Sequence, residues 1–368
     1  MTVTIHAVST PGEVRVAASS GDELLDYALW RPGAPDSVGD LHRGRIAAVV
    51  PAMAGAFVAL ADAEGFLPDS EGAKGLTAGT ILGVRVTRAA QGQKGPRLTA
   101  KLTAEEQAAV GTGSVGLVRR GRDPLHRLAA RYPQAPVIAD DSALAAGLRS
   151  TLGARLTLQP GATFNDDIAA AVDALAEPVV DLPNGSRLSI WPTPALVAID
   201  VDSGAAAGGR HQHEAINRAV LPALAAQIRL RNLSGAIVVD LAGLSPRRRS
   251  ALAPDLERVL ASDPLHPRFL GFTALGLAEI VRPRVHPPLH ELLNSPLAAA
   301  LAALRGIIAG YHAAARLPVL RAAPPVVTAL QGDPVALADL VRRTGHNLIV
   351  RSDPSLPNLA WVLEHDDG

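Results

Sequence analysis

Residues 188–204, LSIWPTPALVAIDVDSG, contain the feature that decides the fold, an aliphatic run at 196–199 that ends on Asp200. A second run of the same kind, at 236–239, ends on Asp240. Short apolar runs bounded by turn signals are typical of buried strands. In α/β sheets ligands bind outside the carboxyl ends of the strands, so both carboxylates are expected at one edge of a sheet.

Two carboxylates held together in this way can share a divalent cation. Proteins commonly bind Mg²⁺ through one or two carboxylates plus water and substrate oxygens. Such a cation favours phosphodiester hydrolysis, because it neutralises phosphoryl charge and lowers the pKa of the attacking water. Asp202 is close enough in sequence to orient Asp200 or to hold the water shell. The alternative is that these aspartates cap turns or helices, and spacing alone leaves that alternative open.

The flanking sequence predicts the rest of this sheet. Strands at 178–182 and 187–191 surround the turn signal Pro-Asn-Gly-Ser at 183–186, which indicates a β-hairpin. An amphipathic helix is expected over 211–231, between the two strands that end on aspartate, and another helix over 245–262.

The N-terminal part of the chain predicts short strands. Strand-like segments with Gly and Pro between them recur from 39 to 103, a spacing typical of a small β-barrel. Residues 104–177 are rich in Ala and Leu with short helical patterns. The chain closes on a small α/β unit, with a helix expected at 334–344 and a strand at 347–351.

Composition bounds the kind of protein. A chain of 368 residues with 48% hydrophobic residues is long enough for two to four globular domains. Its net charge of zero argues against a general nucleic-acid binder. Arginines cluster at 119–122 and 247–249, which suits bidentate phosphate contacts but also follows from GC-rich coding.

Cysteine is absent, which removes disulfides and thiolate zinc sites and fits a reducing compartment. The N-terminus has no basic segment followed by an apolar one, so no secretory signal is visible. The apolar stretch at 297–310 is too short to span a bilayer. We therefore expect a soluble, cytoplasmic protein without a membrane partner.

The stretch at 188–204 resembles the catalytic signature of the ribonuclease E/G family, which has "TEAL" followed by "VAIDVNSG". Five further segments are similar to family motifs and occur in the family's order, over roughly residues 2–290. They are RPG at 31–33, GFLP at 65–68, QKGPRLT at 93–99, QIRLRNLSGAIVVD at 227–240 and LGLAEIVRPR at 275–284.

The resemblance implies a magnesium-dependent endoribonuclease. It makes Asp200 and Asp240 the ligands of the catalytic Mg²⁺. Asp202 stands where the family has the Asn that hydrogen-bonds the first aspartate, so a third acidic group lies in the catalytic set. This change is expected to tighten metal binding or to raise the pKa of a neighbouring carboxyl through like-charge repulsion. The acid that often follows the second aspartate in the family is lost here.

The resemblance also implies an RNA-binding surface. Phe57, Phe66 and Lys94 correspond to the residues of the family's OB-fold that contact RNA, and aromatic faces and a lysine suit unpaired bases and phosphate. Arg119 and Arg120 fall where the family binds the RNA's 5′-monophosphate. Arg120 replaces a threonine there, which puts 5′-end sensing in doubt.

The expected fold is an α+β multidomain protein with an OB-fold β-barrel inserted in a ribonuclease H-like and DNase I-like α/β catalytic region. The expected parts are ribonuclease H-like strands at 1–38, the OB-fold at 39–103, a shortened 5′-sensor and ribonuclease H-like region at 104–177, a DNase I-like catalytic domain at 178–293 and a small α/β domain at 294–368. The family's cysteine link is absent, so neither structural zinc nor a zinc-linked tetramer is expected, whereas a homodimer is possible.

The predicted activity is hydrolysis of single-stranded RNA, in RNA processing or decay, to 5′-phosphate and 3′-hydroxyl products. Two alternatives stay open. One is a catalytically decayed paralogue that only binds RNA, and the other is a metal-dependent phosphodiesterase that acts on DNA.

Overall fold

The computed structural model describes the whole chain except residues 1, 162–163, 205–209, 242, 312–315 and 365–368. It divides into two compact units. One unit comprises Met1–Ala34, Pro124–Pro283 and Pro288–Gly368, and the other comprises Pro35–Asp123 and Arg284–Pro287. None of the described helices is both long and apolar enough to cross a membrane.

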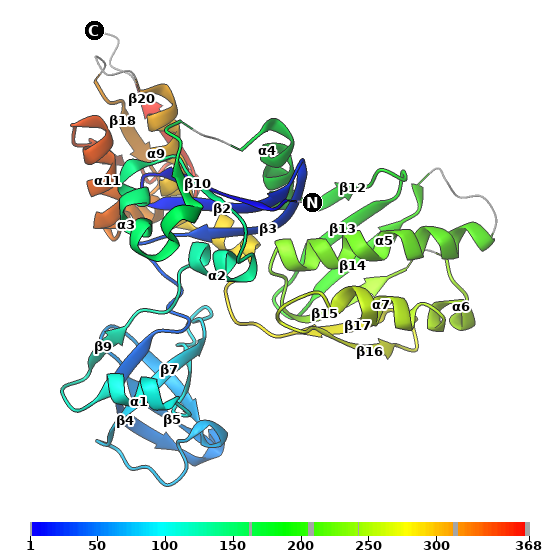
Figure 1. The fold of residues 1–368 in the computed structure, drawn as a ribbon, viewed down its shortest axis with the longest axis horizontal. Coiled ribbons are helices and arrows are strands. Elements are labelled where there is room, and N and C mark those ends of the chain that lie inside the picture. The colour runs from blue at the N-terminus through cyan, green and yellow to red at the C-terminus, as the bar shows by residue number, and fades with distance from the viewer. Residues whose placement is uncertain (1, 162–163, 205–209, 242, 312–315, 365–368) are drawn as a thin grey trace. The chain divides into compact units, whose positions relative to one another are not determined.

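The smaller unit is a closed β-barrel (Figure 1). Its strands pair in the order β5-β6-β8-β7-β4, and pairing of β4 with β5 closes the barrel. Alternate side chains such as Ile46, Val58 and Leu98 fill the interior, as the strand period of two requires. The strands are β4 (Leu41–Val50), β5 (Gly55–Ala59), β6 (Glu64–Pro68), β7 (Ile81–Arg88) and β8 (Arg97–Thr99). The predicted OB-like barrel is therefore confirmed.

Two more elements group with the barrel. They are α1 (Ala104–Val110) and β9 (Gly116–Arg119), and β9 extends the sheet beside β4. The short helices η1 (Pro51–Met53) and η2 (Asp69–Glu71) connect its strands. The compact unit thus runs on to Asp123, beyond the last barrel strand.

The larger unit begins with a five-stranded sheet in the order β11-β10-β1-β2-β3. One face packs against α2 and α3 through Ile5 and Ala7, and Val8 on the other face packs with side chains of α4. The strands are β1 (Thr4–Thr10), β2 (Glu13–Ser20), β3 (Glu23–Trp30), β10 (Val137–Ala139) and β11 (Leu156–Leu158). The helices are α2 (Pro124–Arg131), α3 (Ser142–Leu152), η3 (Gly153–Arg155) and α4 (Asp166–Asp173).

A second sheet of the larger unit carries the two strands that end on aspartate, and we call it the aspartate sheet. Its six strands run in the order β12-β13-β14-β15-β17-β16. They are β12 (Val179–Asp181), β13 (Arg187–Pro192), β14 (Val197–Asp202), β15 (Gly235–Asp240), β16 (Arg268–Phe272) and β17 (Ala278–Arg282). The predicted hairpin is present as β12 and β13, with Gly185 of its turn at φ 79°.

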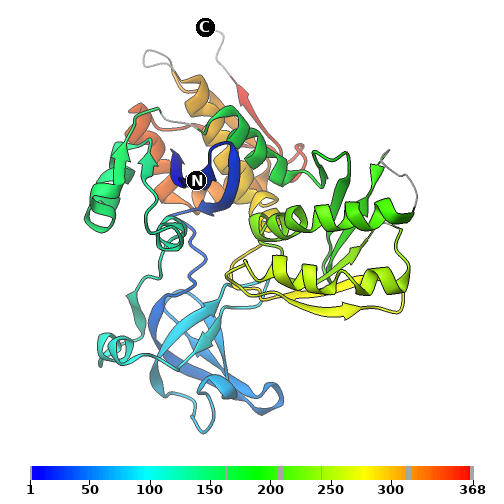
Figure 2. The same ribbon diagram turned by 45° about the vertical axis from the view of Figure 1, so that its right-hand side comes forward.

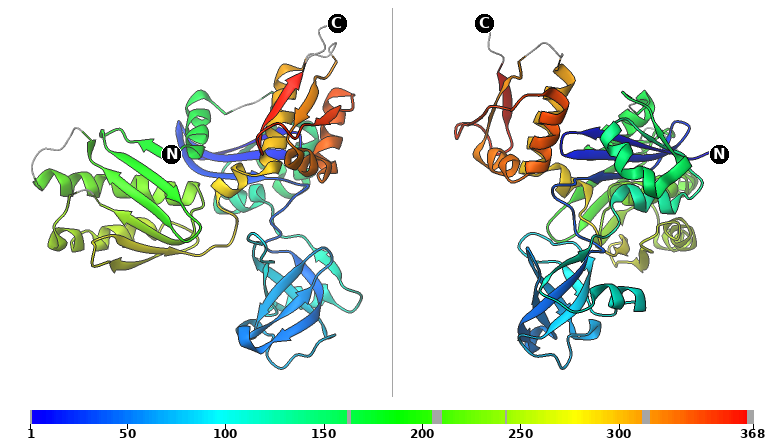
Figure 3. Two further views of the ribbon diagram at one scale, coloured as in Figure 1. Left: turned by 180° about the vertical axis from the view of Figure 1, so that it is seen from behind. Right: turned by 60° about the vertical axis from the view of Figure 1, so that its left-hand side comes forward.

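Helices cover one face of the aspartate sheet (Figure 2). α5 (Arg210–Leu230) and α7 (Ala253–Leu260) bury their aliphatic side chains against Val197, Ile199 and Val239. The opposite face carries no described helix of this unit and faces the viewer in Figure 3, left. The single helix predicted over 245–262 is instead two, α6 (Pro246–Ser250) and α7, because Pro254 stands at the start of α7 and cannot continue a preceding helix.

The last part of the chain packs helices on a three-stranded sheet, ordered β19-β18-β20. Its helices are α8 (Leu289–Leu293), α9 (Pro296–Gly310), α10 (Pro324–Gln331) and α11 (Pro334–Thr344). Its strands are β18 (Val319–Ala322), β19 (Val350–Ser352) and β20 (Trp361–Glu364). Glu13 of β2 ties this part to the first sheet, since it is 4% exposed and accepts hydrogen bonds from Arg31 (2.9 Å) and from Arg305 of α9 (2.9 Å).

Candidate active site

Asp200 and Asp240 are brought side by side by the pairing of their strands. β14 and β15 are parallel, and their register makes Asp200 and Asp240 direct partners. Neighbouring strands lie about 5 Å apart, so the two carboxylates project from adjacent backbones. The structure thus places both predicted ligands at the same edge of one sheet.

Strand alternation turns these carboxylates outward. Val197, Ile199 and Val201 of β14 are buried against the helices, so Asp200 and Asp202 between and after them point to the open face. A shift of one residue in register would bury the aspartates and expose the valines and isoleucine. The hydrophobic face therefore fixes where the acidic groups stand.

The electrostatics of the pair are unfavourable without a cation. Loss of water contact raises the pKa of Asp200, and the negative charges of Asp240 and Asp202 raise this pKa further. Within the described part of the chain neither Asp200 nor Asp240 has an ion-pair partner. Two adjacent, unneutralised carboxylates are a suitable donor set for a hard divalent cation.

Asp202 stabilises the turn that follows β14. Its Oδ1 accepts a hydrogen bond from the backbone N–H of Gly204 at 2.9 Å, which closes a turn after β14. Across the sheet it pairs with Arg187, whose Nε donates to Asp181 at 2.7 Å. No group of three or more His, Asp or Glu side chains in the described residues converges as a metal site. Asp202 thus borders the aspartate pair without closing a three-carboxylate cluster.

Other side chains share the open face, and the sequence did not single them out. Ser189 of β13 is the partner of Asp200, which extends the row to three strands. One pleat away Trp191, Ala198 and Glu279 form part of the next row. The alternation of buried and exposed residues in β13 indicates that Ser189 and Trp191 share one face. Only the pairing of β13 with β14 shows that this face also carries Asp200.

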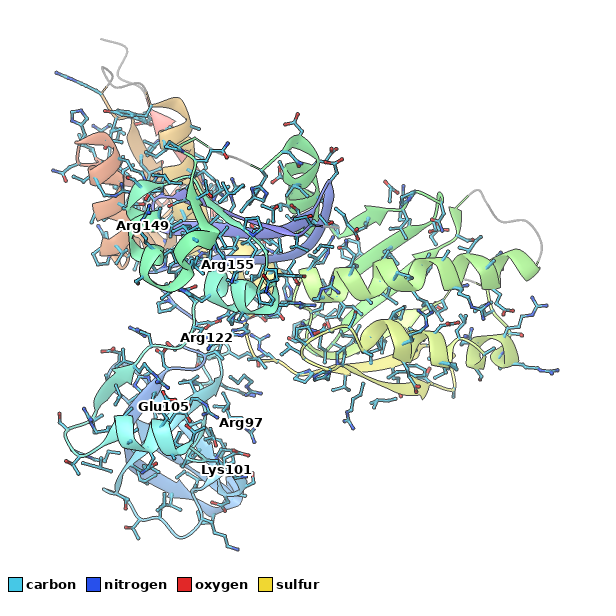
Figure 4. The ribbon with its side chains drawn as sticks, in the orientation of Figure 1. Arg97, Lys101, Glu105, Arg122, Arg149 and Arg155 are labelled. Atoms are coloured by element: carbon cyan, nitrogen blue, oxygen red, sulfur yellow. The ribbon has the colours of Figure 1, made fainter. Side chains whose placement is uncertain are left out.

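The barrel brings two of the predicted RNA-binding residues together. Phe57 and Phe66 are register partners on β5 and β6, with ring centroids 5.6 Å apart at an interplanar angle of 66°. Lys94 is exposed in the turn between β7 and β8, where its backbone and that of Gln91 exchange hydrogen bonds of 2.9 Å. Arg97 of β8, labelled in Figure 4, is the next register partner of Phe66 and was not predicted as a site residue.

Arg119 and Arg120 are engaged by acidic side chains of the barrel unit. Arg119 donates to Glu105 at 2.9 Å, and Arg120 donates to Asp40 at 2.7 Å. Asp40 is 2% exposed and also accepts the backbone N–H of Gly121 at 2.7 Å. An incoming phosphate would therefore compete with carboxylates that already hold both guanidinium groups.

The protein is thus a multidomain α+β protein with a closed OB-like barrel. Its candidate site is a pair of aspartates on the open face of a sheet. Residues 158–285 match the sequence model of the Ribonuclease E/G family. Ribonuclease G of Escherichia coli (strain K12) is 25% identical over 401 residues, which cover 80% of this chain and 82% of that protein. The match over residues 158–285 and the similarity over most of the chain support the ribonuclease E/G family, as the motifs predicted.

Two other relatives match a shorter part of the chain at higher identity. Ribonuclease E of Synechocystis sp. is 33% identical over 133 residues, 35% of this chain and 20% of that protein. Ribonuclease E of Nostoc sp. is 35% identical over 131 residues, 34% of this chain and 19% of that protein. The ribonuclease G and ribonuclease E relatives indicate an endoribonuclease, a hydrolase, and confirm the prediction from the motifs.

Proposed function

We propose that this protein is a magnesium-dependent endoribonuclease that hydrolyses single-stranded RNA. The observation that carries the proposal is the direct pairing of Asp200 with Asp240 on the open face of the aspartate sheet. The relatives bear the names ribonuclease G and ribonuclease E, which supports RNA as the substrate.

Asp200 and Asp240 are the proposed ligands of one Mg²⁺. When bound, this ion supplies charge neutralisation on the phosphoryl group and a lower pKa for the attacking water. Asp240 and Asp202 disfavour the ionised form of Asp200 in the metal-free protein, so a cation relieves repulsion that is already present. Mg²⁺ needs few protein ligands, which agrees with a site of two carboxylates.

The remaining residues of the site position the pair. Asp202 closes the turn after β14 through Gly204 and so holds the carboxyl end of that strand. Its carboxylate adds negative charge next to the metal ligands, which favours a divalent over a monovalent cation. We propose that the products carry a 5′-phosphate and a 3′-hydroxyl, as expected for attack by water on the phosphorus with departure of the 3′ oxygen.

Phe57, Phe66 and Lys94 are the proposed RNA-binding residues of the barrel. An aromatic pair offers ring faces on which unpaired bases stack, whereas paired bases are not accessible to such stacking. Lys94 is exposed and can meet a phosphate. These contacts select single strands without reading a particular sequence.

The decisive experiment is cleavage of a short, AU-rich, 5′-monophosphorylated RNA with Mg²⁺ or with EDTA. Asp200→Asn and Asp240→Asn should each abolish cleavage while RNA binding and thermal stability are retained. Asp167→Asn, which removes an exposed carboxylate from the first turn of α4, is the matched control and should cleave normally. Normal turnover by either site variant would overturn the metal site, and tight binding without cleavage in any divalent metal would instead favour a decayed RNA-binding paralogue.

A further inference from the structure

Trp191 stands on the open face of the aspartate sheet with 53% of its surface exposed. Its neighbours in β13, Leu188 and Ile190, are buried against the helices, so alternation directs Trp191 to the face that carries the aspartates. The chain has only three tryptophans among 368 residues. A large aromatic side chain exposed beside a candidate active site offers a face on which an unpaired base can stack.

The register places Trp191 one pleat from the aspartate pair. Trp191 is the partner of Ala198, whereas Ser189, two residues earlier, is the partner of Asp200. Two residues of a strand span about 7 Å, and adjacent strands lie about 5 Å apart. That separation is comparable to the length of one extended nucleotide.

The side chains next to Trp191 on the open face are small and apolar. Ala198 and Val238 continue its row across β14 and β15. Neither side chain is as large as an indole, so they leave the ring of Trp191 accessible from the side of the aspartates. A base can therefore lie against the indole while the phosphate attached to its nucleotide lies at the carboxylate pair.

A recess of about 220 Å³ adjoins Trp191 at the end of β13. Its wall includes Pro178, Pro192, Arg231 and Asn294. Arg231 is 6% exposed and donates to the backbone oxygens of Glu177 (2.6 Å) and Ala174 (3.0 Å), which fixes its guanidinium group. The recess is thus a preformed, mixed polar and apolar cavity large enough for a single heteroaromatic ring system.

We propose that Trp191 and this recess form a base-binding subsite for the nucleotide next to the scissile phosphate. The proposal rests on the endoribonuclease function proposed above. The indole stacks on one face of the unpaired base, and the recess receives the edge of the base that points away from the aspartates.

The charges of the open face favour a base over a phosphate at this position. Asp200 and Asp240 lie in the adjacent row, and Glu279 lies at the far end of the row of Trp191. On the open face a phosphate would lie beside these carboxylates, whereas stacking of a neutral base does not carry that penalty. Arg231 in the recess already donates to Glu177 and Ala174. A protein partner fits poorly, because a stable interface needs about 800 Å² from each side and this patch is a single indole with small neighbours.

Abasic substrates test the proposal directly. In the wild-type protein, removal of one particular base beside the cleavage site should weaken binding by about five- to 150-fold, the range for loss of one stacked base. Trp191→Ala should cause the same loss with intact RNA and no further loss with the abasic RNA. Trp191→Phe should restore most of the binding, because it keeps a ring. Leu270→Ala is the control, since Leu270 is also 53% exposed but lies on the opposite edge strand, β16.

Fluorescence supplies a measurement that does not depend on cleavage. In EDTA, an intact oligonucleotide should quench tryptophan emission of the wild-type protein more than that of Trp191→Phe, and the abasic oligonucleotide should remove this difference. Equal abasic penalties in wild type and Trp191→Ala, or unchanged quenching in Trp191→Phe, would overturn the subsite. A shift of Trp191→Ala from dimer to monomer with unchanged RNA binding would also overturn it, in favour of contact between copies of the chain.

The two proposals fail separately. If RNA is cut with Mg²⁺ but the abasic effect is independent of Trp191, the subsite is wrong and the endoribonuclease stands. If no RNA is cut while quenching depends on Trp191 and on the base, the endoribonuclease is wrong and base binding at Trp191 stands.

Discussion

Asp200 and Asp240 are direct partners across β14 and β15, the one parallel pairing found in the described part of the aspartate sheet. Helix α5 connects these two strands and returns the chain to the end of the sheet at which β14 begins. Parallel strands present their carboxyl ends at one edge, so Asp200 near the end of β14 and Asp240 at the end of β15 become neighbours. An antiparallel pairing would have put them at opposite ends.

Mg²⁺ should stabilise the folded protein through this pair. We expect saturating Mg²⁺ to raise the free energy of unfolding by about 1–3 kcal/mol, since a ligand that binds only the folded state stabilises it. In Asp200→Asn this increment should disappear. Without metal the variant should be at least as stable as wild type, because one of two mutually repelling carboxylates is gone. Thermal melts with EDTA and with Mg²⁺ measure both effects, and an equal Mg²⁺ increment in the variant would contradict the site.

Glu13→Gln should destabilise the larger unit by about 3 kcal/mol, because it leaves the guanidinium groups of Arg31 and Arg305 without their shared anion. Urea unfolding followed by circular dichroism measures the loss. Glu105→Gln is the matched control. Glu105 also pairs with an arginine but is 82% exposed at its side chain, so its replacement should cost less than about 1 kcal/mol. Equal losses in the two variants would contradict this account.

Asp140, at the end of β10, should make stability depend on pH. Burial raises its pKa to about 6, although the N–H of Ser9 donates to its Oδ1 at 2.9 Å. Because the folded-state pKa exceeds the unfolded value of 3.8, the contribution of the neutral carboxyl is complete below about pH 4 and is lost as pH rises through about 6.

Asp140→Asn keeps the oxygen that accepts from Ser9 and stays neutral at every pH. It should therefore be more stable than wild type at pH 8, by roughly 1–3 kcal/mol, and equal to wild type below about pH 4. Thermal melts over this pH range test the prediction, with the exposed Asp167→Asn as control. A stability difference that does not change with pH would count against it.

Lys94→Gln should reduce the salt dependence of RNA binding. Each phosphate contact on a single strand contributes about 0.7 to the slope of log K against log salt, so the slope should fall by about that amount. Lys74→Gln removes an exposed lysine of the same barrel unit and serves as the control. Fluorescence anisotropy over a series of salt concentrations gives the slopes, and equal slopes for wild type and Lys94→Gln would exclude a phosphate contact there.

A 5′-monophosphate should give little advantage over a 5′-hydroxyl. Arg119 and Arg120 are held by Glu105 and by the buried Asp40, so a phosphate has to displace carboxylates. We expect the cleavage rates of the two RNAs to differ by less than about three-fold, which corresponds to less than about 0.7 kcal/mol. Single-turnover rates with the two 5′ ends test this, and a ten-fold preference for the monophosphate would contradict it.

Features that depend on neighbouring residues were predictable from the sequence. The aliphatic runs ending on Asp200 and Asp240 gave the strands, because alternation and termination are local properties. Helix α11 follows the predicted range 334–344, since Asp333 caps its start at Ala336 N–H and Gly345, at φ 73°, ends it.

What only the tertiary structure decided are pairings between distant segments. The register of β14 with β15 makes the two aspartates neighbours, and the register of β13 with β14 sets Trp191 beside them. The hydrogen bond from Arg120 to Asp40 joins residues 80 positions apart. These relations depend on which buried faces pack together, and no local pattern specifies that choice.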